Sequence, residues 1–146
     1  MAQTTITDAI TDLILEVFRL NGRLLVAGDR LVAGLGLTSA RWQVLGAMAL
    51  AERPQPVAWL ARSMGLHRQG VQRIVNELEK EALVAFAENP NHRRAQLVIL
   101  TARGRAAYEA ATRLQGSWAK GLAEGFSRAE IEACATLIGG LRKRLE

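Results

Sequence analysis

Four long hydrogen-bonding side chains lie close together near the middle of the 146-residue chain: Arg68, Gln69, Gln72 and Arg73. Arginine and glutamine carry donors and acceptors that match the major-groove edges of guanine and adenine. No acidic residue occurs between Arg53 and Asn76, so nothing in this segment repels a polyanion. We therefore predict that the four residues contact double-stranded DNA, with Arg68 suited to guanine and Arg73 to a phosphate.

The elements that must position these residues follow from two short apolar patterns on either side of Gly65. Both patterns have helical spacing, and their members are Val57, Leu60, Ala61 and Met64, then Leu66, Val71, Ile74, Val75 and Leu78. Glycine adopts the positive φ of a tight turn between helices at little cost, and the small Ala61 lets a second helix cross closely. This pattern predicts a helix-turn-helix rather than an ordinary helical hairpin with a solvated basic face.

The charge distribution supports a nucleic-acid partner. The chain has 19 Lys and Arg against 14 Asp and Glu, a net charge of +5. Nine basic and four acidic residues lie between Arg53 and Arg105, so this segment holds the whole excess. A membrane surface is the competing polyanion, but the segment lacks a long basic amphipathic helix with an aromatic face. We expect a DNA partner and no membrane partner.

Two β-rich runs follow the second helix, at residues 83–87 and 96–100. The turn-forming loop between them contains the adjacent Arg93 and Arg94. This pattern predicts a two-stranded β-hairpin wing along the sugar-phosphate backbone, with an arginine at the minor groove. Residues 53–56, Arg-Pro-Gln-Pro, are interpreted as a stiff connection into the helix-turn-helix.

The flanks of the chain are expected to be helical. Residues 4–32 form a long apolar helix capped by Thr5 or Thr7, and its stripe is wide enough to favour a subunit interface over burial within one chain. A helix over 37–51 follows. Another runs from 102 to about 124, where several glycines are expected to bend or break it.

The last helix begins at a capping box formed by Ser127 and Glu130. The predicted fold is therefore mainly α (α+β), a winged helix-turn-helix with N- and C-terminal dimerisation helices. Residues 37–101 form the DNA-binding domain, and residues 1–36 and 102–146 form the helical dimerisation region of a homodimer.

Cysteine and histidine are too few for a structural metal or disulfide framework. Cys134 is the single cysteine, and His67 and His92 complete no usual zinc ligand set, so we expect no metal and no cofactor. Cys134 lies on the apolar stripe of the last helix. It is interpreted as a small core residue, with a redox sensor as the alternative.

The chain lacks the usual signatures of an enzyme, a secreted protein or a membrane protein. Gly34 and Gly36 lack the third glycine of a dinucleotide fingerprint, and no catalytic triad has a supporting context. The polar, acidic N-terminus is not a signal peptide, and no apolar run reaches membrane-spanning length. We expect a cytoplasmic protein without catalytic residues.

Two segments resemble the multiple antibiotic resistance regulator (MarR) family: LARSMGLHRQGVQRIVNELEKEALV and ENPNHRRAQLVILTARGR. The second ends in the family's Leu-Thr-x-x-Gly-Arg pattern, here Leu100, Thr101, Gly104 and Arg105. The resemblance implies a homodimeric winged helix protein that binds a palindromic operator and usually represses its own gene and neighbouring genes. It also implies release by a small aromatic molecule or by thiol oxidation. The alternative is a ligand-independent architectural or constitutive regulator.

The resemblance also suggests where an effector lies, between the dimerisation helices and the winged domain. Trp42 lines such a site or is simply a core residue. Three positions depart from the family pattern. His67 replaces the usual Ser or Thr cap, and Asn91 or His92 replaces the Asp that braces the wing arginines. Ala82 replaces a Gly, which costs roughly 1 kcal/mol if that position is left-handed.

Overall fold

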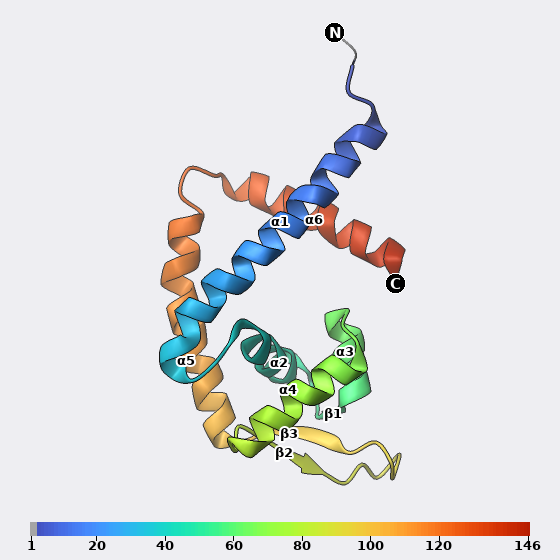
Figure 1. The fold of residues 1–146 in the computed structure, drawn as a ribbon, viewed down its shortest axis with the longest axis vertical. Helices are drawn as coiled ribbons and strands as arrows, with labels where there is room; N and C mark the ends of the chain where they lie inside the picture. Colours follow the sequence, from blue (N-terminus) through green and yellow to red (C-terminus); the bar gives the residue numbers. More distant parts are fainter. Residues whose placement is uncertain (1–2) are drawn as a thin grey trace. The chain divides into compact units, whose positions relative to one another are not determined.

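The computed structural model describes residues 3–146, so the first two residues of the expected helical region 1–36 lie outside the described part. The helices are α1 (Ile6–Val32), the 3-10 helix η1 (Ala33–Leu35), α2 (Ser39–Leu50), α3 (Val57–Met64), α4 (Arg68–Lys80), α5 (Ala102–Leu122) and α6 (Arg128–Leu145) (Figure 1). The strands are β1 (Gln55–Pro56), β2 (Val84–Ala87) and β3 (Leu97–Leu100). Two compact units divide within α5, after Thr112. The predicted mainly α winged helix-turn-helix is confirmed.

Capping boxes begin the first and last helices. Thr5, not Thr7, caps α1: its hydroxyl accepts from the Asp8 amide at 3.1 Å, and the Asp8 carboxylate accepts from the Thr5 hydroxyl and amide. These two hydrogen bonds, the hydroxyl's foremost, lower the pKa of Asp8. The predicted box of Ser127 and Glu130 begins α6 in the same way. Because the carboxylate form makes the bonds, each cap stabilises its helix above the ordinary carboxyl pKa and weakens as pH falls.

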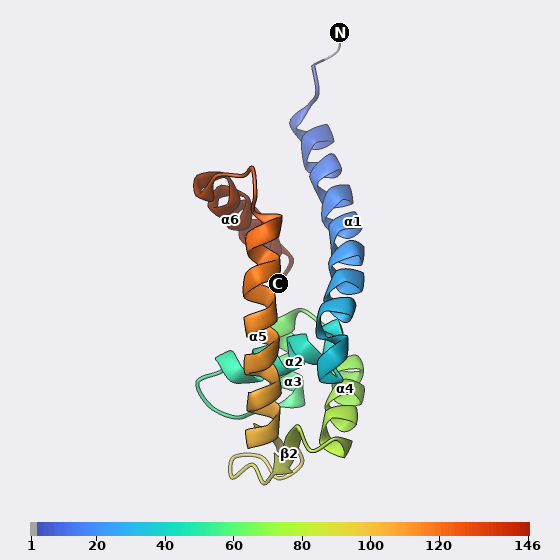
Figure 2. The same ribbon diagram turned by 90° about the vertical axis from the view of Figure 1, so that its left-hand side faces the viewer.

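Helix α1 extends away from the helices of the winged domain, and only its C-terminal turns pack on α2 (Figure 2). The joint is tight because a Cβ at Gly28 would overlap the Ser39 hydroxyl. That hydroxyl donates to the Leu25 carbonyl at 2.7 Å, and the Ser39 amide donates to Asp29 Oδ1 at 2.7 Å. The start of α2 is therefore fixed to the end of α1 by two hydrogen bonds and one glycine.

The hydrophobic core lies mainly among α2, α3, α4 and the sheet. Its buried members are Val32, Leu37, Val44, Leu45, Val57, Leu60, Ala61, Val71, Val75, Leu78, Leu83, Val84, Val98 and Ala111. Six of the nine apolar positions predicted for the helix-turn-helix are among them, and Met64 and Ile74 pack half-buried against them. Leu66 is exposed because it lies in the turn between the helices, so its predicted burial is wrong.

The wing belongs to a three-stranded antiparallel sheet with the order β1-β3-β2, so the two-strand prediction is incomplete. Gln55 pairs with Val98 and Pro56 with Leu97. Residues 53–56 gave no strand signal because two paired residues show no period and proline is depleted from strands. Pro56 is tolerated since β1 is an edge strand, where a missing N–H breaks no central ladder. The strand fixes the start of α3 against the wing.

Thr101 joins the sheet to α5. Its hydroxyl lies 2.7 Å from the Ala82 carbonyl oxygen and 2.9 Å from that of Leu83, and it accepts from the Gly104 amide at 3.0 Å. A Cβ at Gly104 would overlap the Leu83 carbonyl. The Leu-Thr-x-x-Gly-Arg pattern is therefore a packing requirement: threonine caps α5 and glycine admits the chain that enters β2.

Two expectations for the C-terminal helices are wrong. Helix α5 runs unbroken through Gly104, Gly116 and Gly121, because a single glycine costs only about 1 kcal/mol in a helix. Cys134 is exposed, and α6 has no buried residue, so this thiol is not a core residue of a single chain. Helical periodicity predicts an apolar stripe, but it does not say whether the same chain covers it.

None of the helices within residues 3–146 combines the length and apolar character needed to cross a membrane.

Ala82 has a φ of 60°, so the strained left-handed conformation does occur. We predict that Ala82→Gly raises the free energy of unfolding by about 1 kcal/mol, because glycine adopts this conformation without the Cβ clash. Ala85→Gly is the control: it is an exposed position of β2, where glycine should cost about 0.5–1 kcal/mol. Urea denaturation at fixed protein concentration measures both. An Ala82→Gly protein no more stable than wild type contradicts the strain argument.

Candidate nucleic-acid interface

A tight turn sets the angle between α3 and α4. Gly65 ends α3 with a φ of 68°, and its amide donates to the Arg62 carbonyl at 3.2 Å. The Leu66 amide donates to the Ala61 carbonyl at 2.9 Å, which completes the turn. His67 precedes α4 and makes no side-chain capping bond, as its residue type predicts. The positive end of the α4 dipole therefore has no side-chain acceptor.

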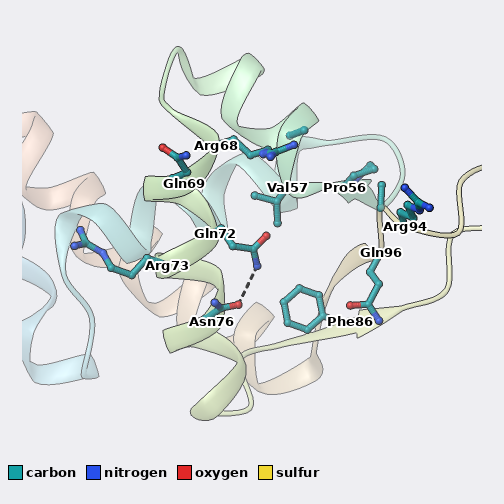
Figure 3. A pocket seen from close by; sticks show the side chains of 12 residues that line it. Pro56, Val57, Arg68, Gln69, Gln72, Arg73, Asn76, Phe86, Arg94 and Gln96 are labelled. Carbon is teal, nitrogen blue, oxygen red and sulfur yellow. Dashed lines mark hydrogen bonds between the residues drawn. The ribbon is translucent and has the colours of Figure 1, made fainter.

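An open groove of about 700 Å³ lies between α4, the start of α3 and the wing (Figure 3). Its lining residues are Pro56, Val57, Ala58, Arg68, Gln69, Gln72, Arg73, Asn76, Phe86, Arg94, Ala95 and Gln96. Five of the six predicted DNA-contacting residues are among them, and Arg93 is the exception. The lining has three arginines and no acidic side chain, so the groove attracts an anion.

The side chains of α4 form two rows because residues four apart lie on the same face of a helix. Figure 3 shows Arg68, Gln72 and Asn76 on the side that faces the wing. Gln69 and Arg73 extend from the other side of the helix. Gln72 Nε2 donates to Asn76 Oδ1 at 2.9 Å, so the two amides are held together along the groove. Arg68, Gln69 and Arg73 are exposed and Gln72 is half-buried.

The wing supplies the opposite wall of the groove. Arg94 and Gln96 line it just before β3, and the ring of Phe86 lines it from β2. Asn89 shapes the loop tip: its side chain accepts from the Asn91 amide at 3.0 Å, and its carbonyl accepts from the His92 amide at 3.2 Å. This local turn organises the loop that carries the arginines.

The wing arginines make no ion pair among residues 3–146. Arg93 and Arg94 are both exposed. Neither Asn91 nor His92 carries the acidic group that would hold them by charge. Their guanidinium groups are therefore available to an external anion.

Sequence reasoning did not assign seven of the lining residues to this groove, among them the polar or aromatic Asn76, Phe86 and Gln96. Asn76 was detectable, because it lies four residues after Gln72 on the same helical row. Phe86 and Gln96 gave no such signal, since their position depends on the pairing of β2 with β3, where Phe86 is opposite Val98. That register is not visible in either strand alone.

Trp42 does not line the groove. It lies on α2, half-buried, and packs against the hydrophobic core. Within residues 3–146, no group of three His, Cys, Asp or Glu side chains is arranged to hold a metal ion.

Comparison with known proteins gives a family and a fold. A model of the MarR family matches residues 35–95, from the end of η1 to the wing loop. The uncharacterized protein Mb2034c of Mycobacterium bovis is 40% identical over 106 residues, 73% of each chain. The transcriptional activatory protein BadR of Rhodopseudomonas palustris is 30% identical over 99 residues, which span 66% of this chain and 57% of BadR.

Solved structures share the fold over almost the whole chain. Sco5413, a MarR family transcriptional regulator from Streptomyces coelicolor, has a TM-score of 0.80 at 25% identity, covering 94% of this chain and 95% of its own. CouR from Rhodococcus jostii RHA1, solved with bound p-coumaroyl-CoA, has a TM-score of 0.71 at 24% identity, covering 98% and 93%. The family match, the shared fold and the basic groove agree: the chain belongs to the MarR family of transcription regulators.

Proposed function

We propose that this protein is a homodimeric transcriptional repressor that binds a palindromic operator and is released by a small aromatic ligand. The observation that carries the proposal is the groove between α4 and the wing, which gathers three arginines and three glutamines without an acidic residue. Such a surface suits duplex DNA, because arginine and glutamine supply base-edge contacts and the positive charge binds phosphates.

The two rows of side chains on α4 suggest which residues contact base edges and which contact the DNA backbone. Arg68 and Gln72 lie on the inner row of α4, together with Asn76, and are assigned to base edges. Gln69 is assigned to a base edge on the neighbouring row, and Arg73 to a phosphate. Arg93 and Arg94 are assigned to the backbone and minor groove, since both are exposed and unpaired on the wing loop.

The dimer proposal rests on apolar side chains that the single chain leaves exposed. On α1, Ile6 is 87% exposed and Phe18 69%, and on α6 Leu145 is 88% exposed. Apolar residues at helical spacing are normally covered. We assign them to a second copy, so residues 1–36 and 102–146 form the dimerisation region and 37–101 the DNA-binding domain.

The ligand proposal rests on a solved relative and on Trp42. CouR was solved with p-coumaroyl-CoA, an aromatic acyl thioester, bound to it. Trp42 is half-buried on α2, and we propose that it lines the effector site. BadR is described as an activator, so the direction of regulation must be read from transcription as well as from binding. A ligand-independent regulator is the second candidate.

For DNA reading, we predict half-sites about 10 base pairs apart, centre to centre, since a two-fold dimer places its recognition helices in successive major grooves.

Arg68→Ala should cost roughly 1–3 kcal/mol of binding free energy on the operator and relax preference at one base position. Arg94→Ala should weaken operator and scrambled duplexes more evenly and flatten the salt dependence. Binding isotherms at several salt concentrations decide this. Operator preference that survives Arg68→Ala but disappears with Arg94→Ala would make the wing the reader.

For assembly, we predict that Leu137→Asp combined with Leu145→Asp gives a folded monomer, because both side chains are exposed in the single chain and only a second copy would bury them. Light scattering gives the mass and circular dichroism the helical content. Leu50→Asp is the control: this residue is 80% exposed at the end of α2, outside the proposed interface, and the variant should remain dimeric. A wild-type protein of monomer mass at micromolar concentration refutes the dimer.

For regulation, we predict that a phenolic carboxylic acid weakens operator binding about fivefold or more without unfolding the protein. Titration across a panel of such acids, with tryptophan fluorescence recorded in parallel, provides the test. Trp42→Phe should remove most of the fluorescence change, whereas Trp59→Phe, which alters an exposed side chain on α3, should retain it. If no acid in the panel alters binding, the ligand-independent alternative is favoured.

A further inference from the structure

Arg41 of α2 makes two ion pairs at the C-terminal end of α4, one with Glu77 in its last turn and one with Glu81, the residue that follows the helix. Its Nη1 donates to Glu81 Oε1 at 3.0 Å, and its Nε and Nη2 both lie 3.4 Å from Glu77 Oε2. The Arg41 side chain is only 21% exposed, whereas the other ion pairs among residues 3–146 join exposed side chains of a single helix. Partial burial limits screening by solvent, so these contacts hold better than surface pairs do.

The two carboxylates lie at the C-terminal end of α4: Glu77 is in its last turn and Glu81 is its C-cap. Glu77 and Glu81 are four residues apart, and the same row continues backwards to Arg73 and Gln69. The guanidinium group of Arg41 therefore binds the C-terminal half of this row, and the N-terminal half of the same row lines the groove. Because one guanidinium group binds two carboxylates that lie one helical turn apart, it opposes both rotation of α4 about its axis and sliding of α4 along that axis.

The same contacts deal with an electrostatic problem. Glu77 lies on the helix that is proposed to enter DNA and Glu81 directly follows it, so free carboxylates here would be repelled by phosphates. Arg41 offsets one of their two negative charges from the protein side, while Arg68 and Arg73 make no ion pair among residues 3–146. The arginines of α4 are thus available at its groove end, and the carboxylates of Glu77 and Glu81 at the other end are engaged by α2.

Helix α2, which carries Arg41, is itself held in place by hydrogen bonds. The Arg41 amide donates to the capping hydroxyl of Thr38 at 3.2 Å. Ser39 is bonded to Asp29 and to the Leu25 carbonyl on α1. Polar contacts therefore connect α1 to α2 and α2 to α4.

We infer that Arg41 is a positioning residue for DNA reading, which sets the rotation of α4 through Glu77 and Glu81 so that the base-reading side chains meet the major groove in register. The inference deepens the proposed function and rests on it. Arg41 itself does not line the groove, so its effect on DNA passes through α4.

The test uses a duplex selected by the full-length wild-type protein from a random-sequence pool, with a scrambled duplex as reference. Arg41→Gln should lower the ratio of the two affinities about threefold to tenfold, while the slope of log affinity against log salt changes little. Arg19→Gln is the matched control, because it removes a cation paired with Glu16 on α1 and should leave the ratio unchanged. A merely structural or purely electrostatic loss would lower both affinities together.

Two further variants keep the inference testable if Arg41→Gln fails to fold. Glu77→Ala combined with Glu81→Ala removes the partners and should lower the ratio similarly. The reversed set Arg41→Glu, Glu77→Arg and Glu81→Arg should recover the ratio, because the fork is rebuilt with opposite charges.

Two results overturn the inference: an unchanged ratio in folded Arg41→Gln and in the double variant, or equal weakening on both duplexes. If the wild-type protein selects no duplex at all, the proposed function fails instead.

Discussion

The burial of one face of α4 is the constraint on which the rest of this structure depends. Val71, Val75 and Leu78 are fully enclosed, and each contributes about 1.5–3 kcal/mol relative to exposure. Since an α-helix has 3.6 residues per turn, burial of this face fixes which residues point outward. Once this apolar face is packed, the positions of α4 that still face outward are the two rows of polar side chains that line the groove.

The wing is placed by a different kind of constraint, exerted by backbone rather than by apolar side chains. The chain leaves α4 through Ala82 in a left-handed conformation and enters β2 beside Gly104. The Thr101 hydroxyl lies within hydrogen-bond distance of the carbonyl oxygens of Ala82 and Leu83. These contacts leave little freedom in the distance between α4 and the sheet, and hence in the width of the groove that Phe86 and Arg94 line. A strained residue next to a binding surface is a recurring arrangement, because the surrounding packing holds it there.

Charged side chains in the winged domain fall into two groups with different roles. Arg68, Arg73 and Arg94 line the groove without an acidic partner. Arg41 lies between two carboxylates and is mostly covered. An exposed unpaired arginine costs little in water and remains available to a phosphate, whereas a partly buried arginine needs its partners to offset desolvation. The difference in burial therefore separates the residues proposed to contact DNA from the residue proposed to position α4.

The sequence alone determined most of what depends on neighbours in the chain. Helical spacing around Gly65 identified the helix-turn-helix, and the Ser127 to Glu130 spacing identified a capping box. Of the four α4 residues predicted to face outward, Arg68, Gln69 and Arg73 are exposed, whereas Gln72 is half-buried. These features rest on local periods and short-range hydrogen bonds, which residues a few positions apart fully encode. The tertiary structure decided what depends on distant partners. The two-residue strand β1 exists only because β3 lies beside it. Cys134 lies on an apolar stripe that the same chain leaves uncovered. Arg41 and its carboxylates are 36 and 40 residues apart, and no period connects them, because their meeting follows from how α2 and α4 cross.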